Sequence, residues 1–336
     1  MKILDSIELI DENQWKSLLE VSKYRSFFQT RECYDLYAAN ESFMKAFCFA
    51  VEDNNELKGV IIGYVESDGG KLKRFFSRRA IIHAGPLLSE DISPEALALL
   101  LKTCRTRLKK KAIYIEFRNY EDYSPYVEVF ERSGFKYHQH LNFHVCTTTE
   151  EIVQENLGKS RKRDIKASLN AGAEIMENPS FDDIHSYYDI LKDLYEKKIK
   201  TPLFPLSFFE YLYSHDYAKF LLIRTNGSII GGAVCVCLPN HTVYEWFACG
   251  QDGVYKNIYT STLATYAGII YAAQNGYNRF DMMGAGTPDQ GYGVREFKAK
   301  FGGQLVQHGR IDSVSQPLLY LIGKLAVKIM KSHSSK

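Results

Sequence analysis

Several features that identify common classes of enzyme are missing from this chain. Its seven cysteines include no CxxC pair, and the sequence contains neither an HExxH segment nor a Walker-type phosphate loop. Cysteines without a CxxC spacing or a suitably spaced histidine argue against a metal or redox site, and their odd number is typical of a reducing compartment. We therefore expect no metal and no tightly bound cofactor.

A large net charge and a long apolar run are also absent. The 42 Lys and Arg residues nearly balance the 40 Asp and Glu residues, which leaves a net charge of +2 and gives no reason to expect DNA as a partner. No run is long enough to span a bilayer, and residues 1–10 lack the apolar core of a signal peptide. These absences predict a cytoplasmic protein.

The C-terminal segment, residues 318–331, leaves two interpretations open. It is apolar around most of a helix, and Lys324, Lys328 and Lys331 fall on one stripe. Such a helix either docks on one of the domains with its lysines in water or makes a peripheral contact with the inner face of a membrane.

The clearest pattern in the chain is a repeated series of predicted elements. A β-hairpin is predicted at residues 46–66 and again at 219–238, because β-rich runs flank turn pairs that tolerate positive φ. Each hairpin is followed by a third strand, a helix, a strand, a short helix and a closing strand. In the first half these are residues 79–84, 94–110, 112–117, a helix ending at 130–134, and 137–146; in the second half they are residues 242–248, 261–275, 279–283, 294–303 and 304–311. We infer two copies of one α/β unit.

The order of elements within the unit predicts its fold. A run of strands followed by helix, strand, helix and strand gives a mixed sheet with helices packed on it, and the leading hairpin argues against a doubly wound nucleotide fold. The same order occurs in acyltransferases of the GNAT type. We predict an α/β (α+β) fold of two tandem GNAT-like (acyl-CoA N-acyltransferase-like) domains at residues 1–147 and 148–315, with a helix at 316–332 as a candidate to complete the first domain.

Five segments carry a more specific pattern. They are residues 26–37, 158–175, 203–211, 245–250 and 280–303. Together they resemble the FemAB family, the aminoacyl-tRNA-dependent transferases that build peptidoglycan cross-bridges, and the broader FemAB-like acyltransferases. The resemblance also implies twin GNAT domains. The helical arm that some members insert is not expected, since the chain has no long heptad segment.

The segment 280–303, FDMMGAGTPDQGYGVREFKAKFGG, contains both candidate catalytic residues. Phe297-Lys298 matches the family's Phe-Lys motif, which implies a lysine at the reaction site that steadies an oxyanion or a substrate phosphate. Asp281 ends an apolar strand before a glycine-rich loop. It is either a proton-accepting or amine-orienting group with a raised pKa, or a structural acceptor for the loop's backbone donors.

The predicted substrate contacts are aromatic residues and glycines. Residues 200–211 resemble the family's substrate loop, and glycines let the backbone approach a ligand closely. The predicted contacts are Phe204, Phe208, Tyr211, Trp246, Phe297, Gly284 and Gly286. Family members that act on UDP-muramyl precursors tend to present a basic residue where this chain has Phe204. Residues 32–40 also lack a lysine, and both gaps weaken the case for the usual diphosphate-sugar acceptor.

A group of cations precedes the second copy of the hairpin. Within eight positions near a predicted helix N-terminus stand Lys159, Arg161, Lys162, Arg163 and Lys166. They are candidates to hold phosphates of tRNA or of a diphosphate-linked precursor. The alternative is an ordinary solvated basic face.

The donor is the least determined part of the prediction. Users of acetyl-CoA in the GNAT class carry a glycine-rich turn around the pyrophosphate, and the nearest candidate, residues 251–255 (QDGVY), offers one glycine and an acid. Aminoacyl-tRNA is therefore favoured over acyl-CoA as co-substrate. The predicted function is N-aminoacyl or acyl transfer to an amine of a cell-envelope, peptidoglycan-type precursor. The alternatives are an acyl-CoA-dependent N-acyltransferase acting on an amino sugar or lipid-linked saccharide, and a non-catalytic ligand-binding module on the same fold.

Overall fold

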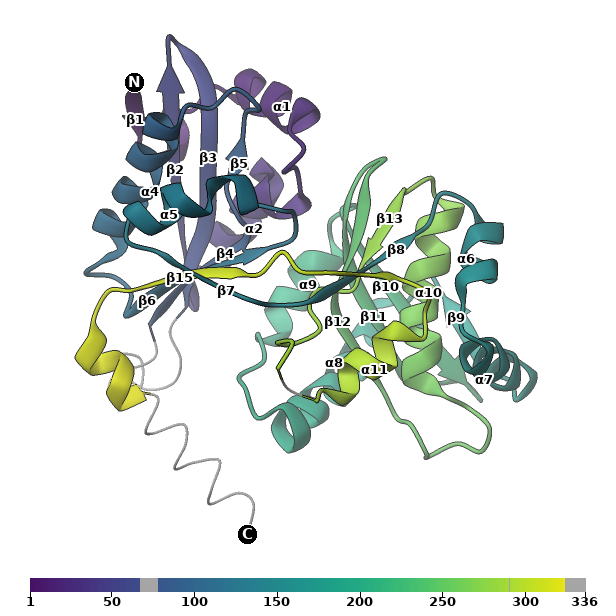
Figure 1. The fold of residues 1–336 in the computed structure, drawn as a ribbon. Helices are drawn as coiled ribbons and strands as arrows, with labels where there is room; N and C mark the ends of the chain where they lie inside the picture. Colours follow the sequence, from purple (N-terminus) through teal and green to yellow (C-terminus); the bar gives the residue numbers. More distant parts are fainter. Residues whose placement is uncertain (67–77, 290, 324–336) are drawn as a thin grey trace. The chain divides into compact units, whose positions relative to one another are not determined.

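The computed structural model describes residues 1–66, 78–289 and 291–323, and these divide into two units (Figure 1). The first unit comprises Met1–Gln139 and His308–Lys336, and the second comprises His140–Gln307. Within the described ranges, no helix has both the length and the hydropathy to cross a membrane.

The first unit is built on a mixed sheet with the strand order β1-β2-β3-β4-β6-β15-β7, in which β5 pairs with β3. Its strands are β1 (Lys2–Leu4), β2 (Met44–Asp53), β3 (Glu56–Glu66), β4 (Arg79–Ala84), β5 (Leu87–Leu88), β6 (Tyr114–Asn119), β7 (Lys136–His138) and β15 (Arg310–Val314). Its helices are η1 (Ile7–Leu9), α1 (Glu12–Val21), η2 (Phe27–Gln29), α2 (Arg31–Ala39), α4 (Pro94–Leu108), η3 (Ser124–Tyr126) and α5 (Val127–Arg132). Among the described strand pairs of this sheet, β4 and β6 run parallel and the others antiparallel.

The second unit has a sheet with the order β14-β8-β13-β12-β11-β10-β9. Of its described strand pairs, β12 and β13 run parallel and the others antiparallel. Its strands are β8 (Asn142–Cys146), β9 (Glu174–Met176), β10 (Ala218–Thr225), β11 (Ser228–Leu238), β12 (Thr242–Gly250), β13 (Arg279–Asp281) and β14 (Gln304–Val306). Its helices are α6 (Glu150–Asn156), α7 (Lys159–Asn170), α8 (Phe181–Leu194), the π-helical turn η4 (Tyr195–Ile199), α9 (Leu206–Tyr213), α10 (Thr260–Gln274) and α11 (Gly293–Ala299).

The predicted repeat of elements is present in both units. Each begins its repeat with an antiparallel hairpin, β2-β3 or β10-β11, and both turns use positive φ: 52° and 63° at Asn54 and Asn55, and 48° and 79° at Asn226 and Gly227. The long helices α4 and α10, of 15 residues each, follow in matching places and are the longest in the described part of the chain. The predicted mixed sheets and the GNAT-like order of elements are thus confirmed.

The closing strands differ from the prediction. The run predicted at 137–146 is two strands, and β8 pairs with β13 and β14 of the second sheet. The run that begins at 304 is likewise β14 and β15, and β15 pairs with β6 and β7 of the first sheet. Each half of the sequence therefore supplies a strand to the other half's sheet. Periodicity marks a strand but not its partners, so the predicted boundaries at 147 and 315 are not those of the two units.

The terminal helix is described only at its start, residues 317–323. There Tyr320 packs on Tyr114 of β6, with ring centroids 5.5 Å apart, so the start of the helix contacts the first unit. Leu318 and Leu321 are 72% and 58% exposed. The predicted lysine stripe of Lys324, Lys328 and Lys331 lies outside the described residues.

Candidate active site

The candidate site of the second unit lies where its two parallel strands separate. β12 and β13 pair over only three positions, ending with Tyr244 opposite Asp281. Beyond that point β12 continues to Gly250 against β11, while the chain after Asp281 enters the glycine-rich loop. A shift in the register of β11 and β12 leaves Trp246 as an extra residue, next to Glu245. The opening between parallel strands therefore begins beside two carboxylates, Asp281 and Glu245.

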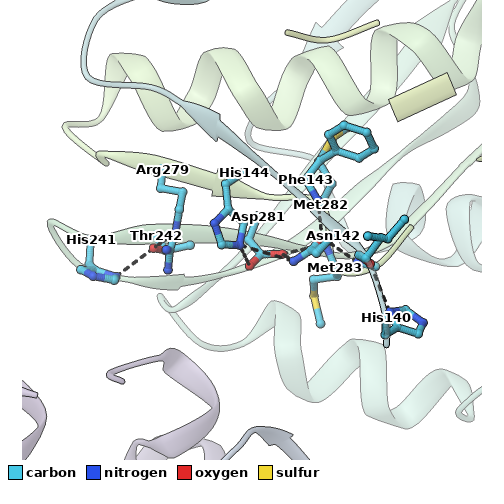
Figure 2. A network of polar contacts seen from close by, with 12 residues as sticks. His140, Asn142, Phe143, His144, His241, Thr242, Arg279, Asp281, Met282 and Met283 are labelled. Carbon is cyan, nitrogen blue, oxygen red and sulfur yellow. Dashed lines mark hydrogen bonds and ion pairs between the residues drawn. The ribbon is translucent and has the colours of Figure 1, made fainter. Parts of the chain in front are cut away.

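Asp281 is fully buried and holds a network of polar contacts, shown in Figure 2. Its Oδ1 accepts hydrogen bonds from the Asn142 side chain and the Met283 backbone N–H, both at 2.7 Å, and its Oδ2 lies 3.1 Å from Nε2 of His144. Burial acts to raise the pKa of Asp281, but His144, Arg279 and Asn142 together outweigh it and the pKa is lowered. Asp281 therefore lacks the raised pKa expected of a proton acceptor. Its contacts match the other predicted role, that of a structural acceptor for the backbone donors of the loop.

The glycine-rich loop after Asp281 is held in an unusual backbone path. Met283, Gly284 and Gly286 all have positive φ, at 52°, 104° and 76°. Asn142 accepts from the Gly284 N–H at 2.7 Å, and backbone hydrogen bonds join Leu141 to both Ala285 and Gly286. A left-handed methionine is unfavourable without such support, so Asp281 and Asn142 fix the loop's shape.

Lys298 points into the same loop from α11. It is buried, and its ammonium donates to the carbonyl oxygens of Met282 and Gly284, the latter at 2.9 Å. Burial lowers the pKa of Lys298, while Glu245 and Asp281 favour its charged form. An ammonium has three N–H donors; in the described part of the chain two of them have partners. Lys298 is therefore not a solvated helix lysine, and its third N–H has no acceptor among the described residues.

Glu245 is the third ionisable group of the site. Its side chain is buried on β12, and Oε1 has no hydrogen-bond partner among the described residues. Burial raises the pKa of Glu245, opposed by the Lys298 ammonium and by a hydrogen bond with Thr265. One ammonium thus lies within the field of two carboxylates, one of which accepts protons more readily than an exposed glutamate.

Arg161 connects the predicted basic segment to the Phe-Lys motif. Its guanidinium lies over the rings of Phe297 and Phe301, 4.4 and 4.9 Å from their centroids, and Nη2 donates to the Phe297 carbonyl at 3.2 Å. It also pairs with Asp164 at 3.4 Å. Arg161 is buried, whereas the remaining four cations, Lys159, Lys162, Arg163 and Lys166, are exposed on α7. The structure thus separates Arg161, which holds Phe297, from the basic surface.

Three of the predicted aromatic contacts, Phe204, Phe208 and Trp246, pack together as one cluster. Phe208 lies 4.7 Å from Phe204 and 5.4 Å from Trp246 between ring centroids. Phe208 is fully buried, so it supports the other two rings, which are partly exposed. Tyr211, one turn along α9, stacks on His215 with centroids 4.3 Å apart. Trp246, one member of this cluster, directly follows Glu245 in the sequence.

Four residues of the site are not among those predicted. Asn142 and His144 come from β8, a strand that the repeat assigns to the other half, so the sequence offered no signal for them. Glu245 had a signal, as a lone carboxylate in the apolar run 242–249. Arg295 donates from Nε to the Ala285 carbonyl at 2.9 Å and from Nη2 to that of Thr287. It thereby holds the far end of the loop.

The fold matches that of several solved structures. FemX superposes with a TM-score of 0.71 at 14% identity, covering 96% of this chain and 100% of FemX. A tandem GNAT protein from the clavulanic acid biosynthesis pathway gives 0.57 at 10% identity, covering 94% and 98%. The C-terminal domain of a protein named as a lysylphosphatidylglycerol synthetase, from Agrobacterium fabrum, gives 0.58 at 12% identity, covering 92% and 93%.

The chain therefore has the fold of a tandem GNAT protein, as predicted. Residues 216–328, most of which lie in the second unit, match the model of the FemAB family, which confirms the predicted resemblance. That match contains Glu245, Asp281, the glycine-rich loop and Lys298. No curated protein matches the chain in sequence.

Proposed function

We propose that the protein transfers an aminoacyl group from aminoacyl-tRNA to an amine of a cell-envelope precursor of the peptidoglycan type. The observation that carries this proposal is the buried Lys298 ammonium, which lies in the family-matched segment at the separation of β12 and β13. The Phe-Lys motif is the part of the sequence that resembles the FemAB enzymes most specifically.

The chemistry of the transfer requires little beyond what this arrangement supplies. The acceptor amine attacks the ester carbonyl to form a tetrahedral oxyanion; the bond to the tRNA ribose oxygen then breaks, and that oxygen takes up the proton that the amine loses. A fixed ammonium near the carbonyl oxygen stabilises that oxyanion, and an alignment of the two substrates lowers the barrier further. Asp281 and Arg295 hold the loop that positions Lys298, while Glu245 favours the charged form of its ammonium.

The start of α10 supports tRNA over acyl-CoA as the donor. Asp252 accepts a hydrogen bond from the Ser261 backbone N–H at 3.0 Å, so a carboxylate already occupies this part of the helix N-terminus. A pyrophosphate bound there would lose that N–H and meet a negative charge. The exposed cations of α7, Lys159, Lys162, Arg163 and Lys166, are the proposed contacts with tRNA phosphates.

The proposed partners follow from the same reaction. They are aminoacyl-tRNA and a cell-envelope precursor, in the cytoplasm, with the segment 318–331 as the proposed contact with the inner membrane face. Phe204, Trp246, Phe297, Gly284 and Gly286 are the proposed substrate contacts near Lys298, and Phe208 and Tyr211 support them.

A transfer assay with matched lysine variants tests the proposal. The purified protein is given a pool of charged tRNAs or labelled acetyl-CoA, together with peptidoglycan precursors, an amino-sugar panel or phosphatidylglycerol vesicles. Lys298→Met should abolish label transfer from tRNA, and Lys298→Arg should restore part of it. Lys300→Met, at an exposed position two residues further on, is the control and should transfer normally.

The other outcomes separate the alternatives. Transfer from acetyl-CoA alone would establish the N-acyltransferase alternative. Transfer to phosphatidylglycerol would move the acceptor from a wall precursor to a lipid. No transfer from either donor, with a ligand still bound, would support the non-catalytic binding module and reject the proposed function.

A further inference from the structure

A row of basic side chains crosses the sheet of the first unit. The strand registers pair His83 of β4 with Arg118 of β6, Arg118 with Arg310 of β15, and Arg310 with His138 of β7. Figure 1 shows these strands side by side. Side chains of directly paired residues point to the same face of a sheet, so four nitrogen-bearing side chains lie in line across four strands.

The two arginines at the centre of the row share one carboxylate. Glu116 Oε1 lies 2.6 Å from Arg118 Nε and 3.3 Å from Arg310 Nη1. The next acid along the sheet, Asp312, lies 3.1 Å from Nε2 of His138. Like charges directly opposite each other on neighbouring strands repel. Two neighbouring guanidinium groups therefore share one carboxylate oxygen, while the second acid, Asp312, contacts His138.

Most of the hydrogen-bonding capacity of these guanidinium groups is unused. Each has five N–H donors, and within the described ranges one donor of Arg118 and one of Arg310 contact a protein acceptor, the same Glu116 oxygen in both cases. The side chains are 27% and 35% exposed, so each is held by the sheet yet open to solvent. Their unused donors therefore face an accessible surface.

The row also lies where sheets of this kind accept ligands. His83 and Arg118 each stand one residue before the end of the parallel strands β4 and β6. In open sheets with parallel strands, ligands bind beyond the carboxyl ends of those strands. The neighbouring His83 is buried, with Nδ1 2.7 Å from the Tyr120 hydroxyl. Burial and the charges of Arg118 and Arg310 lower the pKa of His83 well below its usual value. The neutral form of His83 is thereby favoured, and it needs no anionic partner.

We propose that Arg118 and Arg310 form a binding site for a phosphoryl group on the first unit, separate from the Lys298 site. A phosphoryl group presents three oxygens, enough to accept from both guanidinium forks, whereas a carboxylate is satisfied by one. The site does not depend on the proposed acyl transfer, because it is defined by residues of the first unit alone. Its ligand is a small molecule that carries a phosphate or diphosphate.

Calorimetric titration of the full chain with sodium pyrophosphate at low ionic strength tests the site. Arg310→Gln and Arg118→Gln should each weaken binding about tenfold, as expected for the loss of a bidentate, charge-assisted contact. Glu116→Gln removes the competing carboxylate and should tighten binding. A purely structural network would not produce tighter binding on the loss of one of its members. Arg132→Gln, an exposed cation on α5, is the control and should bind as the wild type does.

Two further measurements distinguish a small phosphate-bearing ligand from tRNA, and the second arginine variant covers the case in which the first one misfolds. Uncharged tRNA should bind Arg310→Gln normally, and a Lys162→Gln/Lys166→Gln double variant should bind pyrophosphate normally. If Arg118→Gln unfolds, the more exposed Arg310→Gln decides the matter. Wild-type protein that does not bind pyrophosphate, or Arg310→Gln that binds it unchanged, would overturn the proposal. So would a loss of pyrophosphate binding in the α7 double variant alone.

Discussion

Asp281 and Glu245 lie on neighbouring strands of one sheet, but their surroundings move their pKa values in opposite directions. Both are buried. Asp281 has His144, Arg279 and Asn142 around it, which outweigh burial and lower its pKa. For Glu245 burial prevails over Lys298 and Thr265, and its pKa is raised. Two carboxylates with separated pKa values suit different roles: Asp281 stays ionised and holds the loop, while Glu245 is the one able to exchange a proton.

The raised pKa of Glu245 predicts a pH-dependent gain in stability for Glu245→Gln. An acid whose pKa is raised on folding keeps a proton that the unfolded chain has lost, so wild-type stability falls as pH rises from the ordinary glutamate pKa to the folded one. Glu245→Gln cannot ionise at this position, so it lacks this fall in stability with pH. Its free energy of unfolding relative to wild type should increase through that window and then level off, with about 1.4 kcal/mol for each tenfold change in proton affinity.

Urea unfolding between about pH 4 and pH 8 measures this difference. Glu296→Gln, at an exposed position on α11, is the matched control for the change of charge. A difference between Glu245→Gln and wild type that stays flat or declines across the range would show that burial does not govern Glu245.

Asp281→Asn should destabilise the second unit and disable transfer together. The amide that replaces Oδ2 places a donor toward His144, and the rotated alternative deprives the Met283 N–H of its acceptor. Leaving such a buried group unsatisfied costs about 1–3 kcal/mol. Because the pKa of Asp281 is lowered on folding, its contribution is present above the ordinary aspartate pKa and is lost as pH falls. The gap between wild type and variant should therefore shrink in acid.

Thermal and urea unfolding check this expectation, with Asp289→Asn on the exposed end of the same loop as control. An Asp281→Asn protein as stable as wild type at neutral pH would mean that the loop does not rely on this carboxylate.

At the scale of elements, α7 is fixed to the end of α11 by one buried cation and by a close backbone contact. Arg161 covers the rings of Phe297 and Phe301, and the Gly158 N–H donates to the Lys300 carbonyl at 2.9 Å. A side chain at Gly158 would come within 2.8 Å of that carbonyl oxygen. The helix that carries the exposed cations is therefore held beside the helix that carries Lys298.

This arrangement predicts that neighbouring cations of α7 have different effects. Arg161→Gln loses the contacts with both rings and leaves Asp164 with fewer partners, so it should destabilise the protein by about 1–3 kcal/mol. Lys162→Gln is exposed and should change stability by less than about 0.5 kcal/mol. It should instead weaken tRNA binding and reduce the salt dependence by about one phosphate contact.

Filter binding at several salt concentrations, together with thermal unfolding of each variant, separates the two effects. If Lys162→Gln and Lys166→Gln both bind tRNA with wild-type affinity and salt dependence, α7 is an ordinary solvated surface and the donor must be sought elsewhere.

The sequence predicted elements better than it predicted their partners. The hairpin turns and the long helices follow from local chemistry such as positive-φ residues at turns and apolar residues at helical spacing, and both are present. The Lys298 motif lies within one predicted segment, and the aromatic cluster within two. Asn142 and His144 were not, because their role depends on β8 pairing with β13, a contact across 139 positions for Asn142 and Asp281. Nor did any local pattern show that Arg161 is buried while its neighbours are exposed.

At the scale of the whole molecule, the exchange of strands makes the first unit discontinuous in the sequence, whereas the second is the single segment His140–Gln307. β8 lies between β13 and β14, and β15 lies between β6 and β7. In both sheets the exchanged strand fills the position between two strands of the other half. The site also depends on this exchange, since β8 brings Asn142 and His144 to Asp281.

Two fragments that differ only in their boundaries should therefore behave differently. Residues 140–307 retain β8 and every strand of the second sheet, so we expect a cooperatively folded protein. Residues 148–315 follow the repeat in the sequence but lose β8, which leaves β14 without its partner, exposes one edge of β13, and leaves Asp281 without two of its partners. They also carry β15, whose partners β6 and β7 are absent. We expect this fragment to aggregate or to lack a cooperative transition, because unpaired buried strand edges are unstable and associate. Circular dichroism and urea unfolding of both fragments test the point: a cooperative transition for 148–315 that equals that of 140–307 would show that β8 is dispensable and that the units are independent of the exchange.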